Sequence, residues 1–115
     1  MLIVEDEPDL RECLTDFFIG RGFSVDKAFS GEEALQSLEA QAADVILLDI
    51  LLPGMSGMEV LRRAKALHPK ARFIMVTAVD QADVRARAER LGAAAYITKP
   101  FDFTDATWFP VFSPA

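Results

Sequence analysis

The sequence predicts an α/β fold in which helices cover both faces of a parallel sheet of five strands. Short apolar runs alternate with segments of helical periodicity along most of the chain, and this alternation is typical of β-α-β units. The 115 residues are enough for one domain with its own hydrophobic core. Because crossovers between parallel strands are right-handed, we expect a doubly wound open sheet.

Five runs of apolar and β-branched residues are expected to form the strands. Side chains of this kind suit a parallel sheet that is buried on both faces. Acids follow the first and third runs directly, and a threonine follows the fourth, so polar residues mark the ends of these strands. In chain order, the expected strands are residues 2–4, 23–28, 45–48, 73–76 and 95–98.

Four helices are expected between these strands, because apolar residues recur three and four positions apart. The first helix begins at Pro8 and ends before Gly20, which are residue types favoured at those two positions. The second follows a capping-box pattern that starts at Ser30. The third covers residues 58–67, and the fourth covers residues 81–91.

The helical pattern fails after Pro100. Residues 101–115 contain two further prolines, and their aromatic side chains lack a long helical frame. At best, a short helix over about 104–109 is expected. We therefore divide the chain into a domain of residues 1–103 and an atypical C-terminal tail of residues 104–115 that replaces most of a last helix.

Composition and charge argue against several classes of function. The net charge is −6, whereas direct nucleic-acid binding calls for a basic surface. No apolar run approaches the roughly 20 residues that span a bilayer, and no basic segment precedes the first apolar run, so we expect neither membrane association nor a secretory signal. The single cysteine, Cys13, falls at an apolar position of the first helix and is expected in the core. A cytoplasmic location fits these features.

Polar residues follow four of the strands at the ends where open α/β sheets bind their ligands. Glu5 and Asp6 follow the first strand, and Asp49 follows the third. Thr77 follows the fourth strand, and Lys99 follows the fifth. Topology alone is therefore expected to gather three acids, a hydroxyl and a lysine at one edge of the sheet.

Three carboxylates held close together repel one another, so we expect either a protonated acid or a bound cation among them. Oxygen ligands suit a hard ion such as Mg²⁺ (or Mn²⁺). Mg²⁺ in turn suits phosphate oxygens, and Lys99 adds a movable positive charge for the same anion. Asp49, fixed at the end of a rigid strand, is the best candidate to take a phosphoryl group as a nucleophile.

Four segments of the sequence together resemble the receiver domains of bacterial two-component response regulators. They are Ile3–Pro8, Leu47–Gly57, Val76–Ala78 and Tyr96–Phe101, in the family's order and spacing. The resemblance covers about residues 1–103 and implies a CheY-like fold with the flavodoxin-like strand order 2-1-3-4-5. The tail departs from the family, which closes with an amphipathic fifth helix, so an atypical or missing fifth helix is expected.

Position by position, the resemblance implies roles at the metal and phosphoryl site. Asp49 accepts the phosphoryl group. Asp6 binds Mg²⁺ directly, and Glu5 assists through water. Asp49 itself and the backbone carbonyl of Leu51 are the further metal ligands.

The resemblance also implies a switch around the site. Thr77 and Lys99 bind the phosphoryl oxygens, and Tyr96 changes its rotamer as Thr77 moves. The peptide bond between Lys99 and Pro100 is implied to be cis.

The same resemblance implies partners. The phosphoryl donor is a phosphohistidine on a sensor histidine kinase or a phosphotransfer protein, and the domain catalyses its own phosphorylation without being an enzyme in the usual sense. Phosphorylation then biases the surface of the fourth helix and fifth strand between two arrangements. Without a full fifth helix, one face of the sheet is covered either by the tail's aromatic residues or by a second chain. We therefore hypothesise a homodimer through this side and the tail.

Two alternatives stay open. The first is an aspartyl-phosphate phosphohydrolase, but such enzymes usually carry a second acid two residues after the nucleophile, where this chain has Leu51. The second is a truncated or degenerate receiver that acts as an interaction or dimerisation module without being phosphorylated.

Leu51 and Val79 are both apolar and cannot orient an attacking water, so the resemblance further implies slow loss of the phosphoryl group.

Overall fold

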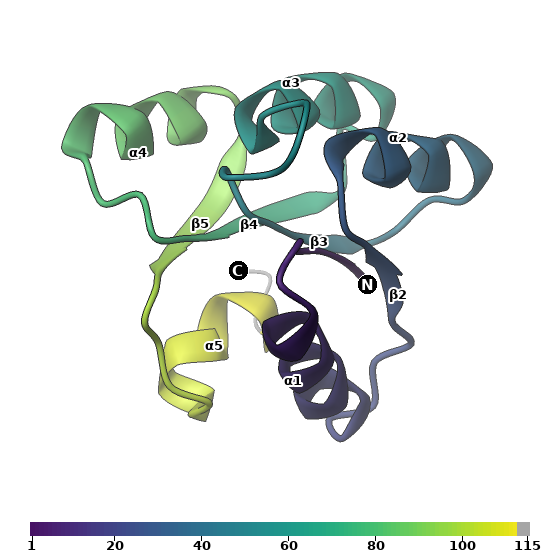
Figure 1. Cartoon of the computed structure of the whole chain (residues 1–115), viewed down its shortest axis with the longest axis vertical. Coiled ribbons are helices and arrows are strands. Elements are labelled where there is room, and N and C mark those ends of the chain that lie inside the picture. The colour runs from purple at the N-terminus through teal and green to yellow at the C-terminus, as the bar shows by residue number, and fades with distance from the viewer. Residues whose placement is uncertain (113–115) are drawn as a thin grey trace.

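The computed structural model describes residues 1–112, which form one five-stranded parallel sheet between two layers of helices (Figure 1). In chain order, the elements are β1 (Leu2–Val4), α1 (Pro8–Ile19), β2 (Asp26–Ala28), α2 (Gly31–Ala40), β3 (Val45–Leu48), α3 (Gly57–Leu67), β4 (Arg72–Thr77), α4 (Ala82–Arg90), β5 (Ala93–Thr98) and α5 (Asp105–Phe112). The strand order is β2-β1-β3-β4-β5, so the expected order 2-1-3-4-5 is confirmed.

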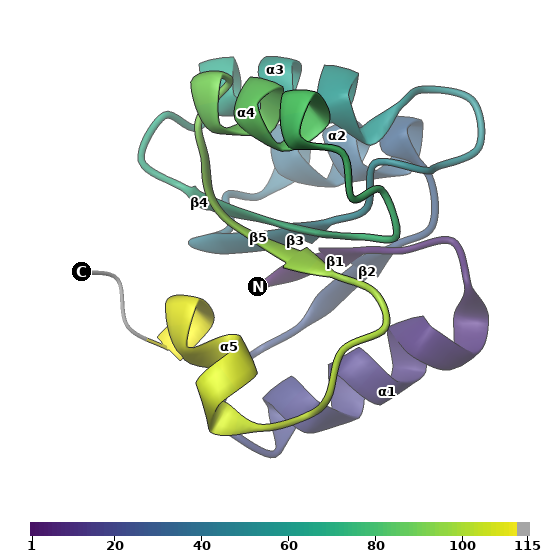
Figure 2. The same ribbon diagram turned by 90° about the vertical axis from the view of Figure 1, so that its left-hand side faces the viewer.

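The sheet separates two hydrophobic clusters. Helices α2, α3 and α4 cover one face, and α1 and α5 cover the other (Figures 1 and 2). Along a single strand, alternate side chains enter opposite clusters: Ile46 and Leu48 of β3 face one, and Leu47 faces the other. This explains why the third strand is a continuous apolar run, as the sequence indicated.

The second strand is shorter than expected. Residues 23–28 were assigned to it, but only Asp26–Ala28 pair with β1. The backbone N–H of Phe23 instead donates to the carbonyl oxygen of Phe18 at 3.1 Å and so closes the end of α1. The Phe23 side chain packs into the core as a strand residue would, which is why the apolar pattern extended the strand too far.

The prediction of a buried Cys13 is wrong, because this side chain is exposed. The buried stripe of α1 centres on Leu14 and Phe18 and extends to Thr15, on the side of the stripe away from Cys13. Thr15 tolerates burial because its hydroxyl donates to the carbonyl oxygen of Arg11 at 2.7 Å. A buried polar residue therefore shifted the helix face that the apolar pattern had indicated.

The fifth helix is present but short, and it continues past the expected end at residue 109. It runs from Asp105 to Phe112 with Pro110 inside it. Trp108 is fully buried, and its Nε1 donates to the carbonyl oxygen of Asp102 at 2.9 Å. The guanidinium of Arg72 donates to the carbonyl oxygens of Pro110 and Val111, which satisfies acceptors at the end of the helix.

The tail therefore covers the face of the sheet that a full fifth helix would cover. Trp108 and Val111 belong to the same cluster as residues of β3, β4 and α1. Of the two occupants considered from the sequence, the tail's own aromatic residues fill this place. The part of the proposed tail at residues 113–115 lies outside the described residues. Within residues 1–112, no helix is long and apolar enough to cross a membrane.

Candidate functional site

Five of the site residues expected from the sequence, the three acids, Thr77 and Lys99, lie at the carboxyl edge of the sheet. Glu5 and Asp6 come directly after β1, and Asp49 directly after β3. Thr77 is the last residue of β4, and Lys99 is the first residue after β5. Each is positioned by a strand of the buried sheet, so the edge itself determines the spacing between them.

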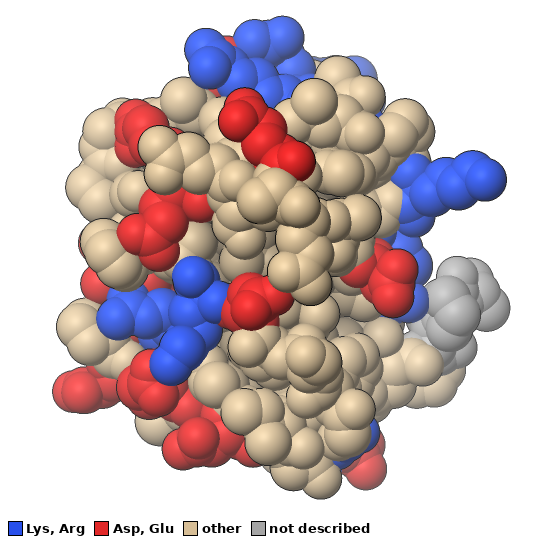
Figure 3. Space-filling model, turned by 90° about the vertical axis from the view of Figure 1, so that its right-hand side faces the viewer, with Lys and Arg blue, Asp and Glu red and all other residues tan. Residues whose placement is uncertain are grey.

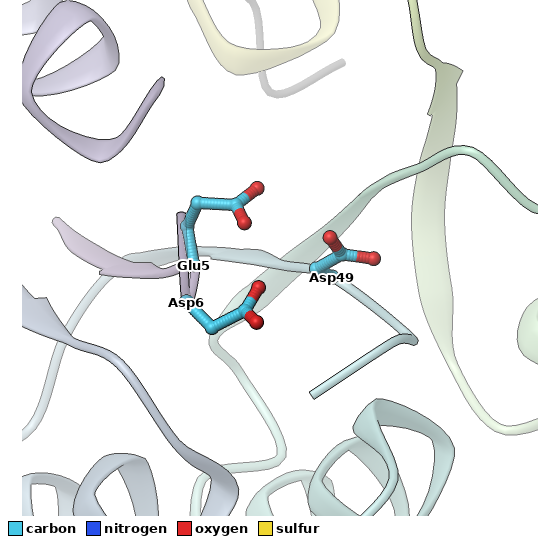
Figure 4. A group of neighbouring side chains, drawn as sticks. All are labelled: Glu5, Asp6 and Asp49. Atoms are coloured by element: carbon cyan, nitrogen blue, oxygen red, sulfur yellow. The ribbon is translucent and has the colours of Figure 1, made fainter. Parts of the chain in front are cut away.

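Three carboxylates face a common space at this edge (Figure 4). One oxygen from each of Glu5, Asp6 and Asp49 lies within 4.8 Å of the others. Glu5 and Asp49 are only 2% and 4% exposed, whereas Asp6 is exposed. Two unit charges about 4 Å apart repel by about 4 kcal/mol at an effective dielectric constant near 20, so this group favours either protonation of an acid or a nearby positive charge.

Lys99 supplies one positive charge to the group. Its Nζ lies 2.6 Å from Glu5 Oε1 and 2.7 Å from Asp49 Oδ2. Burial raises the pKa of Glu5 above its ordinary value, and the hydrogen bond from Lys99 only partly opposes this. Burial alone would lower the pKa of Lys99, but its hydrogen bonds to Asp49 and Glu5 outweigh burial and raise it.

Backbone N–H groups fix the two buried acids. The N–H of Leu51 donates to Asp49 Oδ1 at 3.0 Å, and the N–H of Glu7 donates to Glu5 Oε2 at 3.1 Å. The N–H of Asp49 also continues the strand ladder to the carbonyl oxygen of Val4 at 3.2 Å. Asp49 is thus held in a single orientation, with its carboxylate toward Glu5 and Asp6.

The donor set fits a hard divalent cation. All three side chains offer carboxylate oxygens, and one lysine contacts only two of them. Mg²⁺ is held in proteins by a few carboxylates together with waters, and Asp6 is exposed enough to share a cation with solvent. The chain as a whole carries a net charge of −6, and the face in Figure 3 carries Lys and Arg side chains as well as acidic ones. This net negative charge favours the approach of a cation to the protein.

Thr77 and Tyr96 are connected through the backbone of Val79. The N–H of Val79 donates to Thr77 Oγ1 at 3.3 Å, while the Tyr96 hydroxyl donates to the carbonyl oxygen of Val79 at 2.5 Å. Thr77 is fully buried. Burial raises the pKa of Tyr96, and the guanidinium of Arg85, 4.8 Å from the ring centroid, opposes that rise.

Two features of this edge were not singled out from the sequence. A Cβ at Gly57 would lie 1.9 Å from the carbonyl oxygen of Asp49, so α3 can approach the site this closely only with glycine at its first residue. Arg11 donates to the carbonyl oxygen of Glu5 at 2.9 Å. Gly57 lay at the end of the Leu47–Gly57 segment without a role of its own, and Arg11 lay among the polar residues of the first helix. The peptide bond between Lys99 and Pro100 is cis, as the resemblance implied.

Comparisons with known proteins agree with this architecture. The family model for the response regulator receiver domain matches residues 1–107. Sporulation initiation phosphotransferase F of Bacillus subtilis is 34% identical over 105 residues, which cover 91% of this chain and 85% of that protein. The transcriptional regulatory protein DltR of Streptococcus agalactiae is 38% identical over 102 residues, which cover 89% of this chain.

A chain in the crystal structure of the CheX-CheY-BeF3-Mg+2 complex from Borrelia burgdorferi is similar with a TM-score of 0.90 and 31% identity. The match covers 97% of this chain and 87% of that one. The matched segment is only 46% of the length of DltR, so this chain spans about half of that relative. The family match over residues 1–107, together with the observed fold, places the chain in the response regulator receiver domain family.

Proposed function

We propose that this chain accepts a phosphoryl group on Asp49 in a reaction that needs Mg²⁺ (or Mn²⁺). The observation that supports this most strongly is the convergence of three carboxylate oxygens within 4.8 Å of one another beside a single lysine. Asp49 directly follows β3, the central strand of the sheet, and contacts Lys99 from a nearly buried position. Receiver domains are phosphoacceptors, and this site has the parts that such chemistry requires.

In the proposed reaction, an Asp49 oxygen forms a bond to phosphorus while the bond from phosphorus to the donor imidazole nitrogen breaks. Glu5, Asp6, Asp49 and the backbone carbonyl of Leu51 would hold the cation, which supplies positive charge to the phosphoryl oxygens. Lys99 moves its ammonium group from the carboxylates to the new phosphoryl oxygens.

The proposed switch acts through Thr77. Its oxygen accepts a hydrogen bond from Val79, and among residues 1–112 its hydroxyl proton has no acceptor, so that proton is available to a phosphoryl oxygen. Movement of Thr77 toward the phosphoryl group would weaken its bond to Val79. The carbonyl group of Val79 also holds the Tyr96 hydroxyl, so the β4–α4 loop and Tyr96 should move together.

The donor proposed is a phosphohistidine on a sensor histidine kinase or a phosphotransfer protein, because the relatives belong to two-component systems. We further propose a cytoplasmic protein whose receiver domain does not itself bind nucleic acid, in keeping with its net charge of −6. The division into residues 1–103 and a tail at 104–115 remains a proposal. Its part within residues 105–112 is helical and packs on the domain.

A homodimer through the α4 and β5 side and the tail also remains a proposal. Its support is the exposure of Phe109 on α5, which is 61%. The burial of Trp108 within its own chain weakens the need for a second chain. Sedimentation at micromolar concentration tests it, and a monomer throughout would contradict it.

The test of the proposed function is uptake of phosphate from acetyl phosphate, followed by intact mass. Mg²⁺-dependent addition of one phosphoryl group, lost in excess EDTA, is expected. Absence of any addition would favour a module that is not phosphorylated. Steady release of phosphate from phosphate esters would favour a phosphohydrolase, which the exposed, apolar Leu51 disfavours. Once formed, the phosphoryl group should be lost slowly, and a half-life of seconds would contradict this.

A further inference from the structure

Arg11 reaches from α1 to the backbone of the turn that carries the acid pair. Its Nη1 donates to the carbonyl oxygen of Glu5 at 2.9 Å. That carbonyl belongs to the peptide unit that joins Glu5 to Asp6. The guanidinium also lies over the ring of Phe29, 5.5 Å from the ring centroid, which is within the range of a cation–π interaction. One side chain thus joins α1, the end of β1 and the residue after β2.

Asp6 depends on its backbone for its direction. Within residues 1–112, the Asp6 carboxylate has no hydrogen-bond partner, although it is one of the three acids that converge. The peptide before it is held at its carbonyl oxygen by Arg11. The N–H of the next residue, Glu7, is held by the Glu5 carboxylate. These two bonds hold the peptide units on either side of Asp6.

Phe29 is a large apolar side chain that is 55% exposed. Its contact with the guanidinium restricts the rotamers of the long Arg11 side chain and so keeps the guanidinium on the Glu5 carbonyl. We propose that Arg11, steadied by Phe29, is a positioning residue for the cation site: it fixes the Glu5–Asp6 peptide so that Asp6 is aimed before the cation arrives. This inference rests on the proposed binding of Mg²⁺ at Glu5, Asp6 and Asp49.

The direction in which Mg²⁺ affinity changes when Arg11 is replaced distinguishes a positioning role from a purely electrostatic effect of its charge. Arg11 carries a positive charge near a cation site, so its charge alone opposes Mg²⁺ binding, and its removal would tighten binding. If Arg11 instead positions the ligands, its removal weakens binding, because groups behind a metal's direct ligands commonly contribute tenfold or more to affinity. The two roles predict changes in opposite directions.

The experiment is isothermal titration of Mg²⁺ into the unaltered chain and four variants. Arg11→Met removes the guanidinium, and Arg11→Lys keeps the charge but loses the planar fork. Phe29→Leu removes the aromatic ring that the guanidinium contacts. Lys27→Met is the matched control, because it removes one positive charge from an exposed ion pair with Glu12 that does not touch the turn. Thermal unfolding in EDTA checks that each variant is folded.

We expect the Kd for Mg²⁺ to rise about tenfold in Arg11→Met and by a smaller factor in Arg11→Lys and Phe29→Leu. Lys27→Met should leave the Kd unchanged or slightly lower it. A Kd for Arg11→Met equal to or below that of the unaltered chain overturns the inference, and if that variant does not fold, an unchanged Kd in Phe29→Leu does so. Absence of Mg²⁺ binding by the unaltered chain overturns the proposed function, and this inference with it.

Discussion

Lys99 and Asp49 form the central ion pair of the site, with Nζ 2.7 Å from Oδ2 and a second contact from the same nitrogen to Glu5. This lysine neutralises part of a buried acidic group before any cation is bound. It also occupies oxygens that a cation would use. The pair therefore couples the stability of the domain to the occupancy of its site.

Lys99→Met should lower the free energy of unfolding in EDTA by about 2 kcal/mol, less than for a fully buried pair because Lys99 keeps some contact with solvent. Added Mg²⁺ should restore more stability to this variant than to the unaltered chain, since it replaces the missing positive charge. Urea unfolding with and without Mg²⁺ measures both effects. Equal gains from Mg²⁺ in the two proteins would contradict this coupling.

The tail offers a test in two adjacent residues. Trp108→Ala should lower the free energy of unfolding by about 3–5 kcal/mol, because this fully buried indole packs against the rings of Phe18 and Phe101. Phe109→Ala, at a side chain that is 61% exposed, is the matched control and should cost little. Denaturant unfolding followed by circular dichroism compares them. Similar losses in both variants would mean that the tail does not pack as described.

Gly57→Ala should destabilise the domain by about 1–3 kcal/mol or more, because the new Cβ would overlap the carbonyl oxygen of Asp49. Relief of this overlap displaces either α3 or the Asp49 backbone, so phosphorylation should slow as well. Gly22→Ala is a useful comparison, since a Cβ there meets no atom within 4 Å and only its positive φ of 91° is strained. Phosphorylation at the unaltered rate in Gly57→Ala would refute this close approach.

Tyr96 can be titrated directly because it is the single tyrosine of the chain. Burial raises its pKa above 10.0 in the folded protein, so the phenol form is favoured there. The stability that this contributes is fully present below the ordinary pKa and is lost as the pH rises through the folded value. Tyrosinate absorbance should show a higher midpoint in the native chain than in denaturant. A native midpoint at or below the denatured one would contradict the burial of this ring against Val79.

The sequence predicted the strands and the acidic site correctly where a single local pattern determines the structure. Continuous apolar runs located β3 and β4, and parallel topology then brought Glu5, Asp6 and Asp49 to one edge. The failures came from side chains that hydrogen-bond to backbone carbonyl oxygens, which hydrophobic periodicity does not reveal. Thr15 is buried on α1 in place of Cys13 because its hydroxyl is satisfied locally.

The end of α5 was also predicted wrongly from the sequence. Pro110 predicted an early end to α5, but Arg72, 38 residues away in the chain, donates to the carbonyl oxygens at the end of that helix. The contact of Arg11 with the Glu5 carbonyl is also invisible to periodicity, because a polar helix residue is ordinarily assigned to solvent. Side-chain contacts to backbone carbonyls decided each of these cases.

The central claim is that Asp49 is the residue that carries the phosphoryl group. It is tested most directly by peptide mapping with tandem mass spectrometry after treatment with acetyl phosphate and Mg²⁺, alongside Asp49→Asn. We predict one modified peptide in the unaltered chain, with the added phosphoryl group on Asp49, and no addition in Asp49→Asn. Modification at another residue, or equal addition to Asp49→Asn, would contradict the account.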